Sequence, residues 1–187
     1  MKIGVSHCLL GSKCNFNGKD LLNEFVKQLE DSGEIEFVPF CPEDSVFGSP
    51  RPNLRIVGGD GFDVLDGRAK VIDELGNDVT ESQIEGANRF LAHLNSNQVT
   101  TAILMDGSPS CGSNVLLKED GWPMGGFKKG IGVTTALLKR NNVAVLSSFD
   151  ELDISTFIKS TVPSTVFPLN LKNLRDLPKF KSFFEIT

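Results

Sequence analysis

The amino-acid sequence predicts an α/β protein, a three-layer Rossmann-like domain built on a mostly parallel sheet. Segments with the pattern of buried strands alternate with segments of helical periodicity, which is typical of parallel sheets. The 187 residues, 40% of them hydrophobic and 23% charged, are enough to bury a core. Three of the four cysteines follow the predicted ends of three different strands. Ligands of open α/β sheets bind beyond the carboxyl ends of the strands, so these cysteines are expected to share one crevice.

The first 40 residues predict a βαβ unit. Residues 1–5 and 35–40 are apolar strand-like segments, and a helix is expected over residues 19–31 between them. The helix has one apolar face, formed by Leu21, Leu22, Phe25, Val26 and Leu29. Because such units have a right-handed crossover, the two strands are expected to run parallel.

A stretch rich in glycine and proline follows the second strand. Near residues 44–78 we expect an irregular loop or small β-excursion that covers the site. Short strand-like pieces occur within it at residues 54–57, 62–65 and 69–72. After it, Thr80 and Gln83 have the spacing of a capping box, which predicts the start of a helix that ends near Leu94.

The second half of the chain predicts two more strands, at residues 100–105 and 143–147, with a helix to about Arg140 before the last one. A hairpin or loop is expected over residues 115–129. The segment Gly130-Ile131-Gly132-Val133-Thr134-Thr135 enters the helix, and its backbone N–H groups would suit an anion or a polar ring substituent. We expect one domain over residues 1–148 and a phenylalanine-rich C-terminal extension, residues 149–187, that packs on the core.

Composition argues against several functions. The net charge of −5 gives no broad attraction to extended nucleic acid or to anionic membranes. No apolar run reaches the roughly 20 residues of a membrane span, and the N-terminus lacks the pattern of a signal peptide. A cytoplasmic, reducing location is therefore expected. There, four cysteines are more often metal ligands, catalytic groups or inert thiols than disulfides.

The cysteines leave three interpretations open. Cys8, Cys41 and Cys111 bring soft thiolates from separate loops without a partnering histidine, which favours an iron–sulfur cluster over other metals. Zinc would need a fourth ligand, which Cys14 could supply, although the C-x5-C spacing of Cys8 and Cys14 is not that of a zinc ribbon. Four free thiols without metal are the third interpretation.

Two polar residues flank the cysteines. Glu43 lies two residues after Cys41, and Ser108 lies three residues before Cys111. A carboxylate beside a partly desolvated site could have a raised pKa and exchange protons near neutrality. The alternatives are a salt bridge between Glu43 and Arg51, and a turn role for Ser108 within Gly-Ser-Pro.

Several motifs occur in a specific order along residues 1–148. They are Ser6-His7-Cys8-Leu9-Leu10-Gly11, Cys14-Asn15-Phe16-Asn17-Gly18, Cys41-Pro42-Glu43, Pro50-Arg51-Pro52, Ser108-Pro109-Ser110-Cys111-Gly112-Ser113 and Gly130-Ile131-Gly132-Val133-Thr134. Together they resemble the motifs of the thiouracil desulfidase family. The chain departs from the family pattern at Asn15-Phe16, where Arg-Tyr is frequent, and between Glu43 and Arg51, where Gly-Gly-Leu is usual. Both departures lie close to the expected pocket, so they affect the identity of the expected substrate more than the expected cluster.

The resemblance implies a [4Fe-4S] cluster held by Cys8, Cys41 and Cys111, with a fourth iron that has no protein ligand. That iron would act as a Lewis acid toward the sulfur of a thiolated pyrimidine or related thioamide, and water would replace the sulfur without net redox change. The resemblance further implies that Glu43 transfers protons and that Ser108 assists at the substrate ring or the water. Cys14 corresponds to a cysteine outside the triad.

Two other function classes are compatible with the same residues. A non-catalytic module that binds a cluster or metal, or senses redox state, would use the cysteines but would need neither Glu43 nor Ser108. A plain interaction domain with free thiols would leave Cys8, Cys41 and Cys111 far apart.

Overall fold

The computed structural model describes residues 1–118 and 126–178, and its centre is a four-stranded parallel sheet. The strand order is β2 (Glu36–Phe40), β1 (Lys2–Ser6), β5 (Thr101–Leu104) and β8 (Ala144–Ser147). The register pairs Ser6 of β1 with Phe40 of β2, so these two strands end side by side. The carboxyl ends of β1, β2 and β5 therefore share one edge of the sheet.

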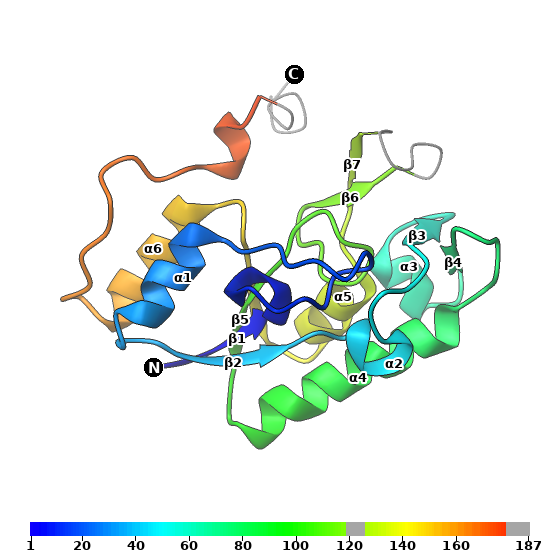
Figure 1. Ribbon diagram of the computed structural model, residues 1–187, viewed down its shortest axis with the longest axis horizontal. Helices are drawn as coiled ribbons and strands as arrows, with labels where there is room; N and C mark the ends of the chain where they lie inside the picture. Colours follow the sequence, from blue (N-terminus) through cyan, green and yellow to red (C-terminus); the bar gives the residue numbers. More distant parts are fainter. Residues whose placement is uncertain (119–125, 179–187) are drawn as a thin grey trace.

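Helices cover both faces of this sheet (Figure 1). One face is covered by α1 (Glu24–Asp31) and α6 (Glu151–Thr161), whose apolar side chains share a core with Ile3 and Val5 of β1. The other face is covered by α4 (Thr80–Ser96) and α5 (Val133–Arg140), which pack on Ala102 and Leu104 of β5. The three-layer α/β architecture predicted from the sequence is confirmed.

Helix α1 begins later than predicted. Asn23 is its N-cap, and the Asn23 side chain accepts a hydrogen bond of 3.0 Å from the backbone N–H of Val26. Leu21 and Leu22 precede the helix and are exposed rather than buried on its apolar face. Between β1 and α1 the chain forms the short 3-10 helix η1 (His7–Leu10), which contains Cys8.

The region of residues 44–78 is a small β-excursion, as expected, but its elements differ from the prediction. Two antiparallel strands, β3 (Leu54–Val57) and β4 (Lys70–Asp73), are joined through α3 (Gly61–Leu65). The strand-like piece at residues 62–65 is thus helical, because Asp60 and Asp63 form a capping box at its start. A further short helix, α2 (Asp44–Phe47), follows Glu43 and was not predicted.

The predicted capping box at Thr80 is wrong. Val79 is the N-cap of α4, and its side chain forms no capping hydrogen bond. The Thr80 hydroxyl instead accepts a hydrogen bond of 2.9 Å from the backbone N–H of Val71, and so ties α4 to β4.

A two-stranded hairpin, β6 (Val115–Leu117) and β7 (Phe127–Lys129), lies where a hairpin or loop was expected. The expected connection over residues 119–125 lies outside the described residues. No helix in the described part of the chain is long and apolar enough to cross a membrane.

The C-terminal segment contributes to the core more than a simple tail would. In α6, Ile154 and Ile158 are fully buried in the cluster that also holds Ile3 and Phe25. A 3-10 helix, η2 (Leu174–Asp176), follows and buries Leu174 against the hairpin. The last part of the expected extension, residues 179–187, lies outside the described residues.

Candidate active site

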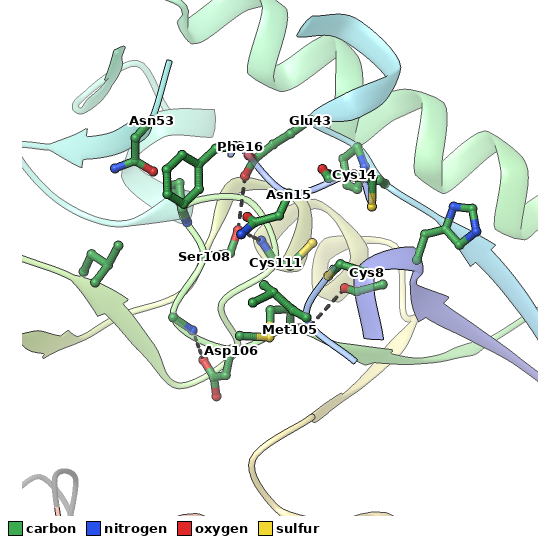
Figure 2. A pocket seen from close by; sticks show the side chains of 18 of the residues that line it. Cys8, Cys14, Asn15, Phe16, Glu43, Asn53, Met105, Asp106, Ser108 and Cys111 are labelled. Atoms are coloured by element: carbon green, nitrogen blue, oxygen red, sulfur yellow. Dashed lines mark hydrogen bonds between the residues drawn. The ribbon is translucent and has the colours of Figure 1, made fainter. Parts of the chain in front are cut away.

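A cavity of about 450 Å³ opens at the carboxyl ends of β1, β2 and β5, and all four cysteines line it (Figure 2). Cys8 follows β1 on η1, Cys41 follows β2 directly, and Cys111 lies in the loop after β5. Cys8, Cys14 and Cys111 are buried, and Cys41 is half-buried. The strand ends thus bring together the three cysteines that are far apart in sequence.

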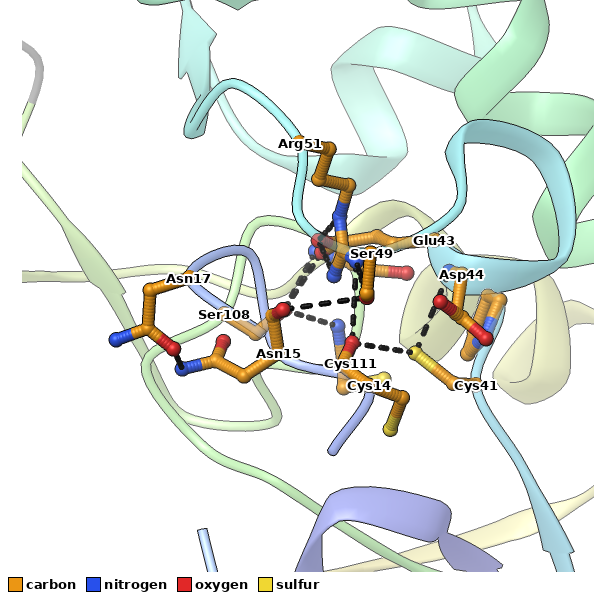
Figure 3. A network of polar contacts seen from close by, with 12 residues as sticks. Cys14, Asn15, Asn17, Cys41, Glu43, Asp44, Ser49, Arg51, Ser108 and Cys111 are labelled. Carbon is orange, nitrogen blue, oxygen red and sulfur yellow. Dashed lines mark hydrogen bonds and ion pairs between the residues drawn. The ribbon is translucent and has the colours of Figure 1, made fainter. Parts of the chain in front are cut away.

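Cys14 lies among the other cysteines. The Cys41 thiol donates a hydrogen bond of 3.6 Å to the carbonyl oxygen of Cys14 (Figure 3). The thiols of Cys41 and Cys8 lie close enough to the Cys14 thiol to influence its pKa. The backbone N–H of Asp44 donates a 3.4 Å hydrogen bond to the sulfur of Cys41. An N–H donor of this kind stabilises a thiolate.

Three of the thiols favour the protonated form in the absence of a cation. The thiol hydrogen bond with Cys14, then burial and the charge of Glu43, raise the pKa of Cys41 far above its ordinary value. Burial is the main cause that raises the pKa of Cys111. The hydrogen bond with Cys41 lowers the pKa of Cys14, but the hydrogen bond with Cys8 and burial outweigh it and raise that pKa to about 11. A metal that binds these thiols must displace their protons.

The Glu43 carboxylate connects two neighbours with different roles. Its Oε2 accepts hydrogen bonds from the Arg51 guanidinium at 2.8 and 3.1 Å, and its Oε1 accepts one of 3.2 Å from the Ser108 hydroxyl (Figure 3). The side chains of Arg51 and Glu43 are 3% and 11% exposed, so this is a buried ion pair. The salt bridge considered from the sequence therefore exists, and it coexists with the contact to Ser108.

Arg51 holds the cysteine loops as well as Glu43. Its guanidinium also donates to the carbonyl oxygens of Cys14 and Gly48 at 3.0 and 2.9 Å. Burial alone would lower the pKa of Arg51, but the Glu43 carboxylate outweighs it and raises that pKa. The charged guanidinium of Arg51 thus holds the Glu43 carboxylate in place.

Ser108 also forms the turn that was considered for it. Its hydroxyl oxygen accepts hydrogen bonds of 3.1 Å from the backbone N–H groups of Ser110 and Cys111. One hydroxyl therefore fixes the backbone of the Cys111 loop and still donates its proton to Glu43. Replacing Ser108 would therefore disturb both the backbone of the Cys111 loop and the hydrogen bond to Glu43.

Asp106 fixes the backbone of the Cys111 loop, and its role was not identified from the sequence. It is 1% exposed, and its carboxylate accepts hydrogen bonds from four backbone N–H groups, those of Gly107, Ser113, Asn114 and Val115. The side chains of Ser113, Asn114 and Ser147 donate to it too. An Asp directly after a buried strand and before a Gly-Ser-Pro turn is the sequence signal that could have revealed it.

The N-terminus of α5 has a different role from the one expected. Its N–H groups donate to carbonyl oxygens of the Cys111 loop, from Val133 to Pro109 at 2.9 Å and from Thr134 to Ser110 at 3.0 Å. A Cβ at Gly132 would lie 2.2 Å from the carbonyl oxygen of Ser110, so only glycine permits this approach. The expected binding of an anion or ring substituent at Gly130–Thr135 is therefore wrong, because the loop itself occupies these donors.

A second glycine brings α4 against the Cys41 loop. A Cβ at Gly86 would lie 2.5 Å from the carbonyl oxygen of Pro42, between Cys41 and Glu43. The helix thus fixes the backbone that presents both side chains to the cavity.

Within the described ranges, no three or more histidine, cysteine, aspartate and glutamate side chains form a group that could hold a single metal ion. In an iron–sulfur cluster each thiolate binds a different iron, so the thiolates stand further apart than ligands of one ion.

The fold and this cavity define a class: parallel α/β proteins with a cysteine-lined site at the strand ends. The comparison with known families places the chain within that class. The chain belongs to the 2-thiouracil desulfurase family, whose model matches residues 3–150.

Two known proteins are similar to this chain over most of their length. The chain is 40% identical over 151 residues to the uncharacterized protein YbbK of Bacillus subtilis (strain 168), an alignment that covers 80% of this chain and 97% of YbbK. Among solved structures, the [4Fe-4S]-dependent thiouracil desulfidase TudS (DUF523Vcz) superposes with a TM-score of 0.66 at 32% identity. That match covers 85% of this chain and 97% of TudS.

Proposed function

We propose that this protein is an iron–sulfur-dependent desulfidase that removes sulfur from a thiolated pyrimidine or a related thioamide. One observation supports it above all: Cys8, Cys41 and Cys111 line the same cavity as the hydrogen-bonded pair of Glu43 and Ser108. The family assignment and the likeness to TudS support the same reaction.

The proposed cofactor is a [4Fe-4S] cluster held by Cys8, Cys41 and Cys111. The donor set fits, since cysteine thiolates are the usual ligands of such clusters and Cys41 already receives an N–H hydrogen bond on its sulfur. With three protein ligands, one iron would remain open toward the cavity. When bound, the cluster would supply a Lewis acid for the substrate sulfur.

The proposed reaction is a hydrolysis. Water adds its oxygen to the thiocarbonyl carbon, the C–S bond breaks, and both protons of the water leave with the sulfur as hydrogen sulfide. The carbon keeps its oxidation state, so no electron donor or acceptor is needed. The products are the oxo compound, uracil in the case of thiouracil, and sulfide.

Glu43 is the proposed proton-transfer group. Arg51 holds its carboxylate in place, and the carboxylate can accept a proton from the attacking water and return it to the departing sulfur. Ser108 orients that carboxylate through the 3.2 Å hydrogen bond, and its hydroxyl faces the cavity where the ring or the water would lie. Cys14 would stay outside the ligand set and pack against it.

A reducing cytoplasm is the proposed location. The four cysteines are free thiols, and a site built from them requires that no disulfide form.

Anaerobically prepared, cluster-loaded protein tests the activity. It should convert 2-thiouracil into uracil and release one sulfide for each uracil formed, without added reductant or oxidant. Uracil formation that requires an added electron donor would contradict the hydrolysis. A protein that keeps its cluster but releases no sulfide from any thiolated pyrimidine or thioamide would instead be the non-catalytic module.

A further inference from the structure

Asn53 lines the cavity and has no assigned role. It lies between Arg51-Pro52 and β3, and in Figure 2 it is on the opposite side of the view from Cys8, with Phe16 and Ser108 between them. The cysteines would thus hold the sulfur end of a substrate, and Asn53 would meet the ring beyond it.

The backbone of Asn53 is fixed on both sides. Its carbonyl oxygen accepts a 2.9 Å hydrogen bond from the N–H of Glu74, and the next residue, Leu54, is buried at the start of β3. Two residues earlier, the N–H of Arg51 donates to the carbonyl oxygen of Phe16 at 2.8 Å. The position of the side chain is therefore set by rigid neighbours.

The carboxamide of Asn53, by contrast, makes no hydrogen bond to any part of the chain within residues 1–118 and 126–178. Asn15 also lines the cavity, but its amide donates to Asn17 at 3.4 Å. Asn53 thus presents both a donor and an acceptor to the cavity.

The rest of the lining favours a flat, uncharged ring. Phe16, Phe127 and Phe149 are among the residues that line the cavity, so part of its wall is aromatic and apolar. Among the described lining residues, Arg51 is the single lysine or arginine, and Glu43 already neutralises it. A phosphate group would find no compensating charge there, so a free base suits the cavity better than a nucleotide.

We propose that Asn53 determines specificity by binding the lactam edge of the substrate, the ring N–H and C=O beside the thiocarbonyl. Oδ1 accepts the hydrogen bond of the ring N–H, and Nδ2 donates to the carbonyl oxygen. This assignment rests on the proposed desulfidase function.

The test compares Asn53→Leu with the unchanged cluster-loaded protein on two substrates. 2-Thiouracil has the lactam edge, whereas pyrimidine-2-thione has no carbonyl group. Two hydrogen bonds of about 1 kcal/mol each predict that kcat/KM for 2-thiouracil falls roughly tenfold to a hundredfold, mostly through KM. For pyrimidine-2-thione the loss should be smaller, about fivefold, because only one of the two bonds can form.

Asn53→Asp is the second variant, since it keeps the size but cannot donate to the carbonyl. It should lose 2-thiouracil activity at least as strongly. Asn95→Leu, the same change at an exposed position on α4, is the matched control and should leave both substrates unchanged. Equal losses on the two substrates, or no loss on either, would overturn the role of Asn53.

Calorimetry with uracil separates this inference from the proposed function. Uracil carries the same lactam edge but no sulfur, and its dissociation constant should rise by a similar factor in Asn53→Leu. If the unchanged protein desulfurises nothing but binds uracil through Asn53, the desulfidase proposal fails and the binding role stands. A dissociation constant for uracil that is unchanged in Asn53→Leu would contradict the binding role, whatever the desulfidase activity.

Discussion

The hydroxyl of Ser108 donates a hydrogen bond of 3.2 Å to the carboxylate of Glu43, and both residues line the cavity that the cysteines line. The two residues come from the ends of different strands, β5 and β2, and each follows or precedes a cysteine by a few positions. Two of the three segments that would bind the metal therefore also carry the proposed proton-transfer group and its hydrogen-bond partner. The predictions below separate these roles.

Glu43→Gln should abolish proton transfer but keep the cofactor. We expect the rate of sulfide release to fall by about 10²–10⁴, the usual contribution of a positioned acid or base. Iron content should not change, since Glu43 is not a ligand in this account. Glu81→Gln, a matched control at an exposed position of α4, should retain full activity. Full activity in Glu43→Gln would refute the assigned role.

The same substitution should also destabilise the protein. Arg51 is 3% exposed and would lose its negative partner, and breaking one half of a buried pair costs about 3 kcal/mol. Chemical denaturation of Glu43→Gln and of the unchanged protein, both loaded, measures this. An unchanged free energy of unfolding would show that Arg51 finds another partner.

The cysteines should differ in their effect on iron. Cys111→Ala should lose most of the bound iron, and Cys14→Ala should keep it, although both side chains are buried in the same cavity. Iron analysis after anaerobic reconstitution distinguishes the two variants. The reverse result would place Cys14 in the ligand set instead of Cys111.

Asp106→Asn should loosen the Cys111 loop without touching a substrate. The new amide group cannot accept the hydrogen bonds that the carboxylate accepts from Ser113, Asn114 and Ser147. With bonds to a buried charge lost, we expect the free energy of unfolding to fall by about 3 kcal/mol or more. Loss of this stability without any loss of iron would mean that the loop keeps Cys111 in place unaided.

Alkaline pH should destabilise the cluster-free protein. The pKa of Cys14 is raised from 9.0 to about 11, so the folded state keeps a proton that the unfolded state loses. The stabilisation is fully present below pH 9 and is lost as the pH rises toward 11. Melting temperatures measured anaerobically at pH 8 and 10.5 should fall more for the cluster-free than for the loaded protein. An equal fall in both forms would contradict this.

We propose that the C-terminal extension, through α6, is an essential part of the hydrophobic core. Ile158 of α6 is fully buried against β1 and α1, so Ile158→Ala should cost about 2–5 kcal/mol. Leu152→Ala on the exposed side of α6 should change stability by no more than about 0.5 kcal/mol. If Ile158→Ala unfolds no more easily than Leu152→Ala, residues 1–148 form the core on their own.

The sheet and the grouping of the cysteines were predictable because both follow from local patterns. Alternating strand and helix segments imply a parallel sheet, and a parallel sheet brings the residues after β1, β2 and β5 to one edge. Glu43 and Ser108 contact each other for the same reason, because each lies close in sequence to a cysteine at the end of a strand of this sheet.

The sequence-based errors concern tertiary contacts. Thr80 has the spacing of a helix cap, but Val71 of a neighbouring strand donates to its hydroxyl. The N-terminus of α5 has the donors of an anion site, but the Cys111 loop packs close enough to use them. Asn53 belongs to no sequence motif. Its possible role becomes visible only in the folded structure, where it lines the cavity just before β3.

Iron and acid-labile sulfide analysis of anaerobically purified, reconstituted protein is the most direct test of the central claim. Three thiolates around a common cavity predict a brown protein with about four irons and four sulfides per chain. The triple variant Cys8→Ala, Cys41→Ala and Cys111→Ala should contain none. Colourless wild-type protein without iron after reconstitution would contradict the account.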